Sequence, residues 1–260
     1  MGIDKKTKVE KAANYVSGGQ SDSIFLVVLN PRTKKINIIS VPRDTYTKIW
    51  IYNKKGEYQG ITYAQLTLQH AYGDGLELSN ERTKKAVEYL FYSLPIHSVS
   101  SVNMGAVSQI NDFVGTIKLK SLYTFTNNGY SFKKGEYVEL KGDIAYEYLH
   151  FRDTSRHYTA QERLERQKQY LKLFINKTIN MLKANPLKAI ELVDIINDYL
   201  VTDLERDEIV YLATELGKYS IGEFYTVEGT VSTEKKYEEF IVNEEALVEL
   251  IFKIFYEKLN

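Results

Sequence analysis

The chain has 260 residues, enough for one large domain or two small ones, and its 34 Lys and Arg residues balance its 34 Asp and Glu residues. A nucleic-acid-binding protein of this size usually carries a basic excess, so the balanced charge argues against a nucleic-acid partner. The chain contains no cysteine, which excludes disulfides, thiolate metal sites and a cysteine nucleophile. No apolar run approaches the roughly 18 residues that a membrane span needs, and the glycine motifs of nucleotide-binding loops and hydrolase elbows are missing.

A hairpin is predicted near the start of the chain. Residues 24–29 and 36–41 are short apolar runs rich in β-branched side chains, the composition of buried strands. The Asn-Pro-Arg-Thr segment between them has turn chemistry. We therefore predict that the ends of the two runs face each other, Ile24 against Val41 and Leu29 against Ile36.

The same register brings Asp22 opposite Arg43 and next to Asp44. Two carboxylates this close repel each other unless a cation lies between them. One interpretation is an ordinary Asp–Arg ion pair that closes the hairpin, and residue types alone favour it. The other is a Mg²⁺ site, because Mg²⁺ takes one or two carboxylates and completes its shell with water and phosphate oxygens.

The rest of the chain alternates between helical and extended patterns. Residues 1–20 are polar and are interpreted as a tail or a short helix, and residues 46–63 as a loop-rich stretch with aromatic residues. Helices are predicted over residues 64–72, 79–93, 107–115, 144–152, 159–183, 186–199, 205–216 and 243–258. Strands are predicted over residues 96–103, 117–125 and 225–231. Because many of these elements are not in βαβ order, the pattern predicts an α/β domain with a mixed sheet.

The long helix over residues 159–183 opens with a cluster of cations. Thr159 and Glu162 match a capping box at its start. Basic and amide side chains gather in its first turns and in the loop before it: Arg152, Arg156, Arg163, Arg166 and Gln167. Guanidinium groups at a helix N-terminus bind phosphate oxygens well. A solvated charged face with intrahelical ion pairs explains the same residues, and the pattern alone leaves both interpretations open.

Several stretches, in this order, resemble the LytR-CpsA-Psr family: SDSIFLVVLNP, INIISVPRDTY, QLTLQHAYGDG, SLPIHSVSSVNMGAVSQINDFVG, FKKGEYVELKGDIAYEYLHFR and QERLERQ. The resemblance implies a three-layer α/β/α fold with a central mixed sheet. It makes residues 21–260 the catalytic domain and residues 1–20 a tail or the remnant of a membrane-proximal segment. Family members are single-pass membrane proteins, so it also implies a location on the extracytoplasmic face of the bacterial membrane, through an anchor not present in this chain.

The resemblance implies a phosphotransferase that moves a phosphate-linked glycopolymer, such as teichoic acid or capsule, from a polyprenyl-pyrophosphate carrier to peptidoglycan. Pyrophosphate cleavage would accompany this activity. Asp22 and Asp44 would hold Mg²⁺ (or Mn²⁺). The catalytic set would be Asp22, Arg43, Asp44, Arg152 and Arg163, and the substrate-binding set Gln65, Arg156, Arg166 and Gln167. Asp153 is a candidate general base. The alternative function is a non-catalytic polyprenyl-phosphate-binding protein that regulates or scaffolds envelope assembly.

The chain departs from the family pattern at four places. The apolar strand ending in Gly-Ser-Asp that usually precedes the hairpin has no evident equivalent in residues 1–20. His150 stands where one arginine is usual, Ala160 replaces an aspartate, and Gln65 replaces a basic residue. Arg156 or His157 would compensate for the lost charge.

Overall fold

A mixed β-sheet forms the centre of the protein. The computed structural model describes residues 1–234 and 237–256. Within them, the largest sheet has the strand order β11-β6-β1-β2-β3-β12. Its strands are β1 (Gly2–Ile3), β2 (Ser21–Asn30), β3 (Lys35–Val41), β6 (Ser100–Asn103), β11 (Leu200–Thr202) and β12 (Ser220–Thr226). The pairs β1/β6 and β3/β12 are parallel and the other pairs are antiparallel, which confirms the predicted α/β fold with a mixed sheet.

The β2–β3 hairpin has the predicted register, with Ile24 opposite Val41 and Leu29 opposite Ile36. The side chain of Asn30 accepts hydrogen bonds from the backbone amides of residues 32 and 33, so it closes the turn. This register fixes which end of the hairpin carries Asp22 and Arg43.

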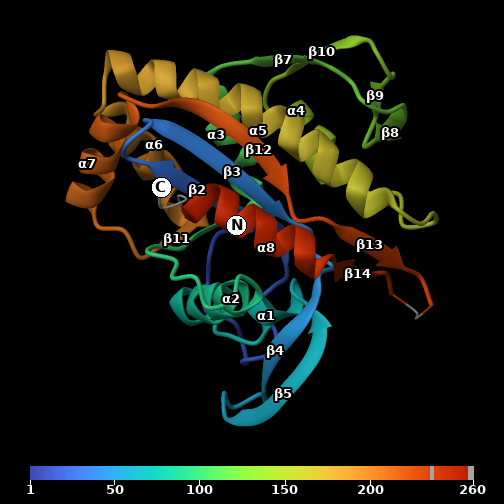
Figure 1. The fold of residues 1–260 in the computed structure, drawn as a ribbon. Coiled ribbons are helices and arrows are strands. Elements are labelled where there is room, and N and C mark those ends of the chain that lie inside the picture. The colour runs from blue at the N-terminus through green and yellow to red at the C-terminus, as the bar shows by residue number, and fades with distance from the viewer. Residues whose placement is uncertain (235–236, 257–260) are drawn as a thin grey trace.

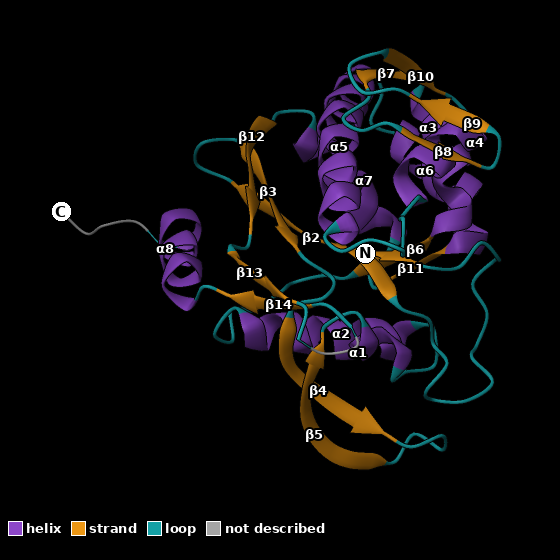
Figure 2. Cartoon of the chain, turned by 90° about the vertical axis from the view of Figure 1, so that its right-hand side faces the viewer, coloured by secondary structure: helices purple, strands orange, loops and turns teal. Residues whose placement is uncertain are grey.

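Helices cover both faces of the sheet. They are α1 (Leu68–Ala71), α2 (Glu77–Leu90), α3 (Val107–Val114), α4 (Asp143–His150), α5 (Thr159–Ala184), α6 (Lys188–Ile196), α7 (Arg206–Leu216) and α8 (Glu244–Phe255), with the 3₁₀ turns η1 (Met104–Ala106) and η2 (Asn197–Tyr199). Helix α8 lies on one side of the sheet and α5 on the other (Figure 2). None of the helices in the described ranges is long and apolar enough to cross a membrane.

The apolar residues of β3 alternate between two cores. Ile39 and Val41 pack with Val87 of α2 and Leu247 of α8 on one face. Ile36 and Ile38 pack with Ile179 of α5 on the other. Burial on both faces explains the continuous apolar run and produces the three layers of the fold.

Smaller hairpins project from this framework (Figure 1). They are β4 (Tyr46–Tyr52) with β5 (Tyr58–Gln65), β7 (Ile117–Lys120) with β10 (Tyr137–Leu140), β8 (Phe125–Asn127) with β9 (Tyr130–Phe132), and β13 (Gly229–Ser232) with β14 (Glu239–Val242). The prediction of a loop over residues 46–63 is therefore wrong. Along β4, the aromatic residues and Lys48 alternate with Thr47, Ile49 and Ile51, and a turn at Asn53–Gly56 separates the strands.

Four further predictions need correction. The helix predicted over residues 64–72 is only Leu68–Ala71, because residues 64–65 end strand β5. The single strand over residues 225–231 is divided between β12 and β13. The start of α5 has no capping box, because Tyr158 is its N-cap and the Thr159 hydroxyl donates to the carbonyl of Asp153 at 2.8 Å. Helix α2 begins at Glu77, before the predicted position. The predicted end of the last helix, residues 257–258, lies outside the described residues.

Candidate functional site

One buried carboxylate lies between two arginines at the open end of the β2–β3 hairpin. Asp22 is in β2, Arg43 follows β3, and Arg163 is on the second turn of α5. Oδ1 of Asp22 forms an ion pair with Nη1 of Arg43, and its Oδ2 accepts from Nη1 of Arg163 at 2.7 Å. The side chains of Asp22 and Arg163 are only 3% and 6% exposed. The charged residues of the hairpin and those of the long helix, which the sequence predicted as two separate clusters, therefore form one site.

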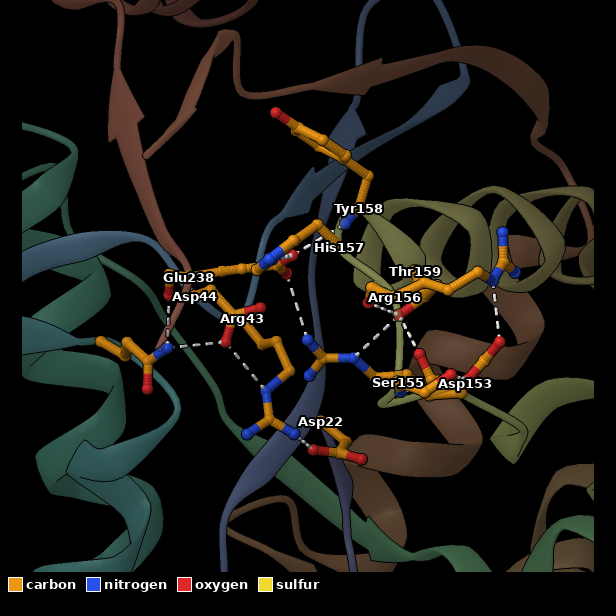
Figure 3. A network of polar contacts seen from close by, with 12 residues as sticks. Asp22, Arg43, Asp44, Asp153, Ser155, Arg156, His157, Tyr158, Thr159 and Glu238 are labelled. Carbon is orange, nitrogen blue, oxygen red and sulfur yellow. Dashed lines mark hydrogen bonds and ion pairs between the residues drawn. The ribbon is translucent and has the colours of Figure 1, made fainter. Parts of the chain in front are cut away.

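Asp44 lies on the other side of Arg43 (Figure 3). Its Oδ1 is 3.4 Å from Nε of Arg43 and accepts from the side-chain amide of Gln65 at 3.1 Å. The guanidinium thus separates the two carboxylates, as the ion-pair interpretation predicts. Gln65, at the end of β5, also donates to the backbone carbonyl of Glu238 at 2.6 Å.

A third carboxylate, that of Glu238, completes the site, although no sequence pattern marked it. Its carboxylate accepts from Nη2 of Arg152 at 3.1 Å and from the backbone N–H of Tyr158 at 2.7 Å, and it lies 3.3 Å from Nδ1 of His157 (Figure 3). Tyr158 is the N-cap of α5. Glu238 therefore occupies an anion position made by a guanidinium and a helix N-terminus. It precedes a short strand in a stretch predicted without structure, so no sequence signal marked it.

The site crowds buried charges of both signs. Burial, together with the nearby guanidiniums, lowers the pKa of Arg43 and of Arg163 to about 10, which still leaves both groups charged at neutral pH. Burial raises the pKa of Asp44, although the arginines oppose that shift. Crowded cations and a desolvated carboxylate in one cleft are typical of a functional site.

A small cavity of about 30 Å³ lies at the centre of these residues. The end of β3, the first turns of α5 and the β13–β14 hairpin line it, with Gln161, Leu164 and Gln167 contributed by α5. This volume holds about two water molecules, because the charged side chains fill most of the site with one another.

Of the remaining predicted site residues, one lines the cavity and two lie outside its lining. Gln167 lines the cavity and donates to the carbonyl of Leu149 at 3.3 Å. Arg166 is buried against aromatic rings, with its guanidinium 4.4 Å from the centre of the Phe125 ring, so it lies outside the cavity lining. Arg156 is exposed and pairs with Asp153 at 2.8 Å.

The candidate base Asp153 is not suited to that role. Hydrogen bonds from Ser155 and Arg156 lower its pKa to about 2, so it is a weak base at neutral pH. It also lies outside the residues that line the cavity. The prediction of Asp153 as the base is not supported by this geometry.

The first strand provides a further carboxylate that the sequence analysis missed. Strand β1 lies between β2 and β6, so these two residues belong to the sheet and not to a tail. Asp4 follows it, and its Oδ1 is 3.2 Å from Nε2 of His150. Interactions with His150, Arg163 and Arg43 lower the pKa of Asp4. Gly2–Ile3 is therefore a short strand beside the hairpin, in the part of the chain where no equivalent of the family's first strand was evident from the sequence.

Histidine and acidic residues do not form a large metal centre. Within the described ranges, no group of three or more His, Cys, Asp or Glu side chains is arranged to hold a metal ion. A cation at this site would therefore be held by one or two carboxylates, as Mg²⁺ often is.

The fold and the site together define a three-layer α/β domain with arginines and carboxylates gathered at a helix N-terminus. The LytR_cpsA_psr family model matches residues 1–253, and the chain belongs to this family. It is 29% identical over 203 residues to the polyisoprenyl-teichoic acid–peptidoglycan teichoic acid transferase TagU of Oceanobacillus iheyensis. That match covers 75% of this chain and 57% of the relative, so the chain spans little more than half of the relative's length.

Solved structures show the same fold. The crystal structure of Bacillus subtilis TagU superposes with a TM-score of 0.62 at 26% identity and covers 92% of this chain and 94% of that one. The crystal structure of protein gbs0355 from Streptococcus agalactiae superposes with a TM-score of 0.75 at 20% identity, and covers 100% of this chain and 88% of that one. These superpositions confirm the three-layer fold.

Proposed function

We propose that the protein transfers a phosphate-linked glycopolymer from a polyprenyl-pyrophosphate carrier to peptidoglycan. The observation that supports this most is the buried Arg43–Asp22–Arg163 cluster beside the N-terminus of α5. Such a cluster binds a pyrophosphate through several charge-assisted hydrogen bonds. The name of the TagU relatives, a teichoic acid transferase acting on peptidoglycan, points to the same chemistry and to a teichoic-acid-like polymer.

The carboxylates present fit Mg²⁺ or Mn²⁺. Oδ1 of Asp22 is buried and makes no well-directed hydrogen bond, although it contacts Arg43. Asp44 is buried, and this desolvation raises its pKa, so a cation beside it would be favourable. Both would hold the ion, which would supply charge stabilisation for the phosphate oxygens.

The residues of this chain bind and orient the reacting groups. Arg43, Arg163 and Arg152 hold the non-bridging oxygens, and Gln167 lines the wall beside them. A sugar hydroxyl of the acceptor attacks the polymer-proximal phosphorus and forms a P–O bond. The bond to the bridging oxygen breaks, and polyprenyl monophosphate leaves with its electron pair. The fixed guanidiniums stabilise the charge that grows on these oxygens.

Glu238 is the carboxylate that accepts the hydroxyl proton in this proposal. It lines the cavity, and three donors hold it before the substrate binds. A substrate phosphate competes for the same donors, Arg152 and the helix N-terminus. When the phosphate takes these donors, the Glu238 carboxylate is free to accept the hydroxyl proton.

This activity requires the extracytoplasmic face of the bacterial membrane, where the lipid carrier and peptidoglycan meet. We propose that the domain acts there, held by an anchor outside the segment described here. The proposed location rests on the lipid carrier, the peptidoglycan acceptor and the names of the TagU relatives.

The test is release of inorganic phosphate or polyprenyl monophosphate from geranyl or polyprenyl pyrophosphate, with Mg²⁺ and with EDTA. We expect metal-dependent turnover that falls at least a hundredfold in Asp44→Asn and in Arg163→Lys. Arg206→Ala is the control, because it removes an exposed arginine that pairs with Asp194 far from the site. Circular dichroism checks that each variant is folded.

The outcomes separate the two candidate functions. Turnover that is the same with EDTA, or unchanged in both site variants, would contradict the proposal. Binding that is lost in Arg163→Lys, without any turnover in the wild type, would instead support the non-catalytic polyprenyl-phosphate-binding function.

A further inference from the structure

The β4–β5 hairpin and α2 share a surface rich in aromatic and cationic side chains. The hairpin projects beside α2 in both ribbon views (Figures 1 and 2). The strand register places Lys48 opposite Tyr63 and Trp50 opposite Ile61 on one face of the hairpin. We call this surface the aromatic face, and it comprises Lys48, Trp50, Tyr52, Tyr58, Ile61 and Tyr63 of the hairpin with Arg82, Lys85 and Tyr89 of α2.

Rings on the aromatic face are open to solvent. Tyr58 is 55% exposed and Tyr63 is 54% exposed, while Ile49 on the opposite face of the hairpin is fully buried. The rings of Trp50 and Tyr89 contact each other edge to face at 6.0 Å. The hairpin thus buries its aliphatic face and presents its aromatic one, the reverse of what burial of apolar area alone would favour.

Cations lie over these rings. Nζ of Lys48 is 4.5 Å from the centre of the Tyr89 ring, and Nζ of Lys85 is 4.8 Å from that of Trp50. Among the residues that the structure describes, neither lysine forms an ion pair with a carboxylate. Both ammonium groups are therefore held in place by the rings and remain able to bind an anion.

The aromatic face begins at the site itself. Gln65, the last residue of β5, donates to Asp44, and the amide of Thr67 donates to the carbonyl of Arg43 at 2.9 Å. Strand β4 has seven residues, so it extends about 20 Å from that point at roughly 3.3 Å per residue. From Gln65 outward, the strand register places Lys48 and Tyr63 two residues further along the hairpin, so the aromatic face continues from the site.

We propose that the aromatic face binds the phosphate-bearing glycopolymer beyond the phosphate that reacts. This proposal rests on the proposed function for its choice of polymer. Sugar rings pack their apolar faces on Tyr58 and Tyr63, and successive phosphates contact Lys48 and Lys85. Charge complementarity favours this polymer over an uncharged glycan.

Trp50 is the only tryptophan of the chain, so its fluorescence reports on this surface. The probe is a soluble oligomer of glycerol phosphate that carries N-acetylglucosamine, titrated into the full chain. We expect Lys48→Gln/Lys85→Gln to weaken binding at least tenfold and to reduce its salt dependence. The control is Lys54→Gln/Lys55→Gln, which removes the same charge from the exposed tip of the hairpin.

Equal losses in the two double variants would overturn the proposal, because they would show non-specific attraction. Equal binding of an uncharged N-acetylglucosamine oligomer would also overturn it and assign the surface to the acceptor glycan. Turnover of geranyl pyrophosphate, which has no polymer, is measured in parallel and should not change. If the wild-type protein binds the oligomer but does not turn over geranyl pyrophosphate, that result would contradict the proposed function and leave the polymer-binding surface supported.

Discussion

Replacement of Asp22 by Asn tests whether the buried cluster holds the fold together as well as the site. Asn keeps the volume of Asp but removes the negative charge between Arg43 and Arg163, so that, among the described residues, only Asp44 still faces Arg43. The Arg43 side chain is 15% exposed and that of Arg163 is 6% exposed, so water compensates little of this charge. Removing one partner of a buried ion pair costs about 3–5 kcal/mol, and we expect that loss in the free energy of unfolding.

The assay is urea unfolding followed by circular dichroism in metal-free buffer. Asp194→Asn is the control, because it breaks an exposed pair with Arg206 and should cost about 0–1 kcal/mol. If uncompensated charge causes the loss, Asp22→Asn/Arg163→Met should be more stable than Asp22→Asn alone. A loss in Asp22→Asn no larger than that in Asp194→Asn would refute the reasoning.

Two further predictions concern His70 and Glu238. Burial lowers the pKa of His70 to about 4, so between that value and its ordinary pKa of 6.5 the unfolded chain binds the extra proton and stability rises with pH. Urea unfolding should show that this group contributes about 2 kcal/mol less to the free energy of unfolding at pH 5 than at pH 7. The His70→Gln variant should lack this pH dependence. The control variant His97→Gln, at an exposed position, should keep it. Glu238→Gln should tighten pyrophosphate binding, because it removes an anion that competes with the substrate, and should lower kcat about 10²–10⁴-fold. The control variant Glu249→Gln, at an exposed position, should leave kcat unchanged. An unchanged kcat in Glu238→Gln would exclude Glu238 as the base.

The main sheet and the long helix could be predicted because their patterns are local. Apolar runs of β2 and β3 fix a hairpin register without any tertiary information, and α5 is marked by its periodicity. The β4–β5 stretch was predicted as a loop because it contains Gly56 and Gly60, although the aromatic residues of β4 alternate with period two and favour a strand. Strand β1 was missed because two residues carry no periodic signal and are defined only by their neighbours in the sheet.

The site was predictable only in part for a similar reason. Asp22, Arg43 and Arg163 belong to strong local patterns, but these patterns predicted two separate clusters, and only the family resemblance implied that they share one site. Glu238 lies in a connection without pattern, and its role arises from contacts with residues about 80 positions away in sequence. Arg166 has the spacing of a site residue, but neighbouring aromatic rings hold it outside the cavity.

The ion-pair and phosphate-site interpretations of Asp22 are compatible. A phosphate site needs guanidiniums fixed in place before the substrate arrives, and unpaired buried guanidiniums would destabilise the fold. Asp22 and Glu238 supply the compensating charge and also position Arg43, Arg163 and Arg152. The substrate must displace part of this pairing, so some binding energy is spent on opening the site. Asp22→Asn and Glu238→Gln therefore separate the two effects, since the first removes an anion the fold requires and the second removes one the substrate replaces.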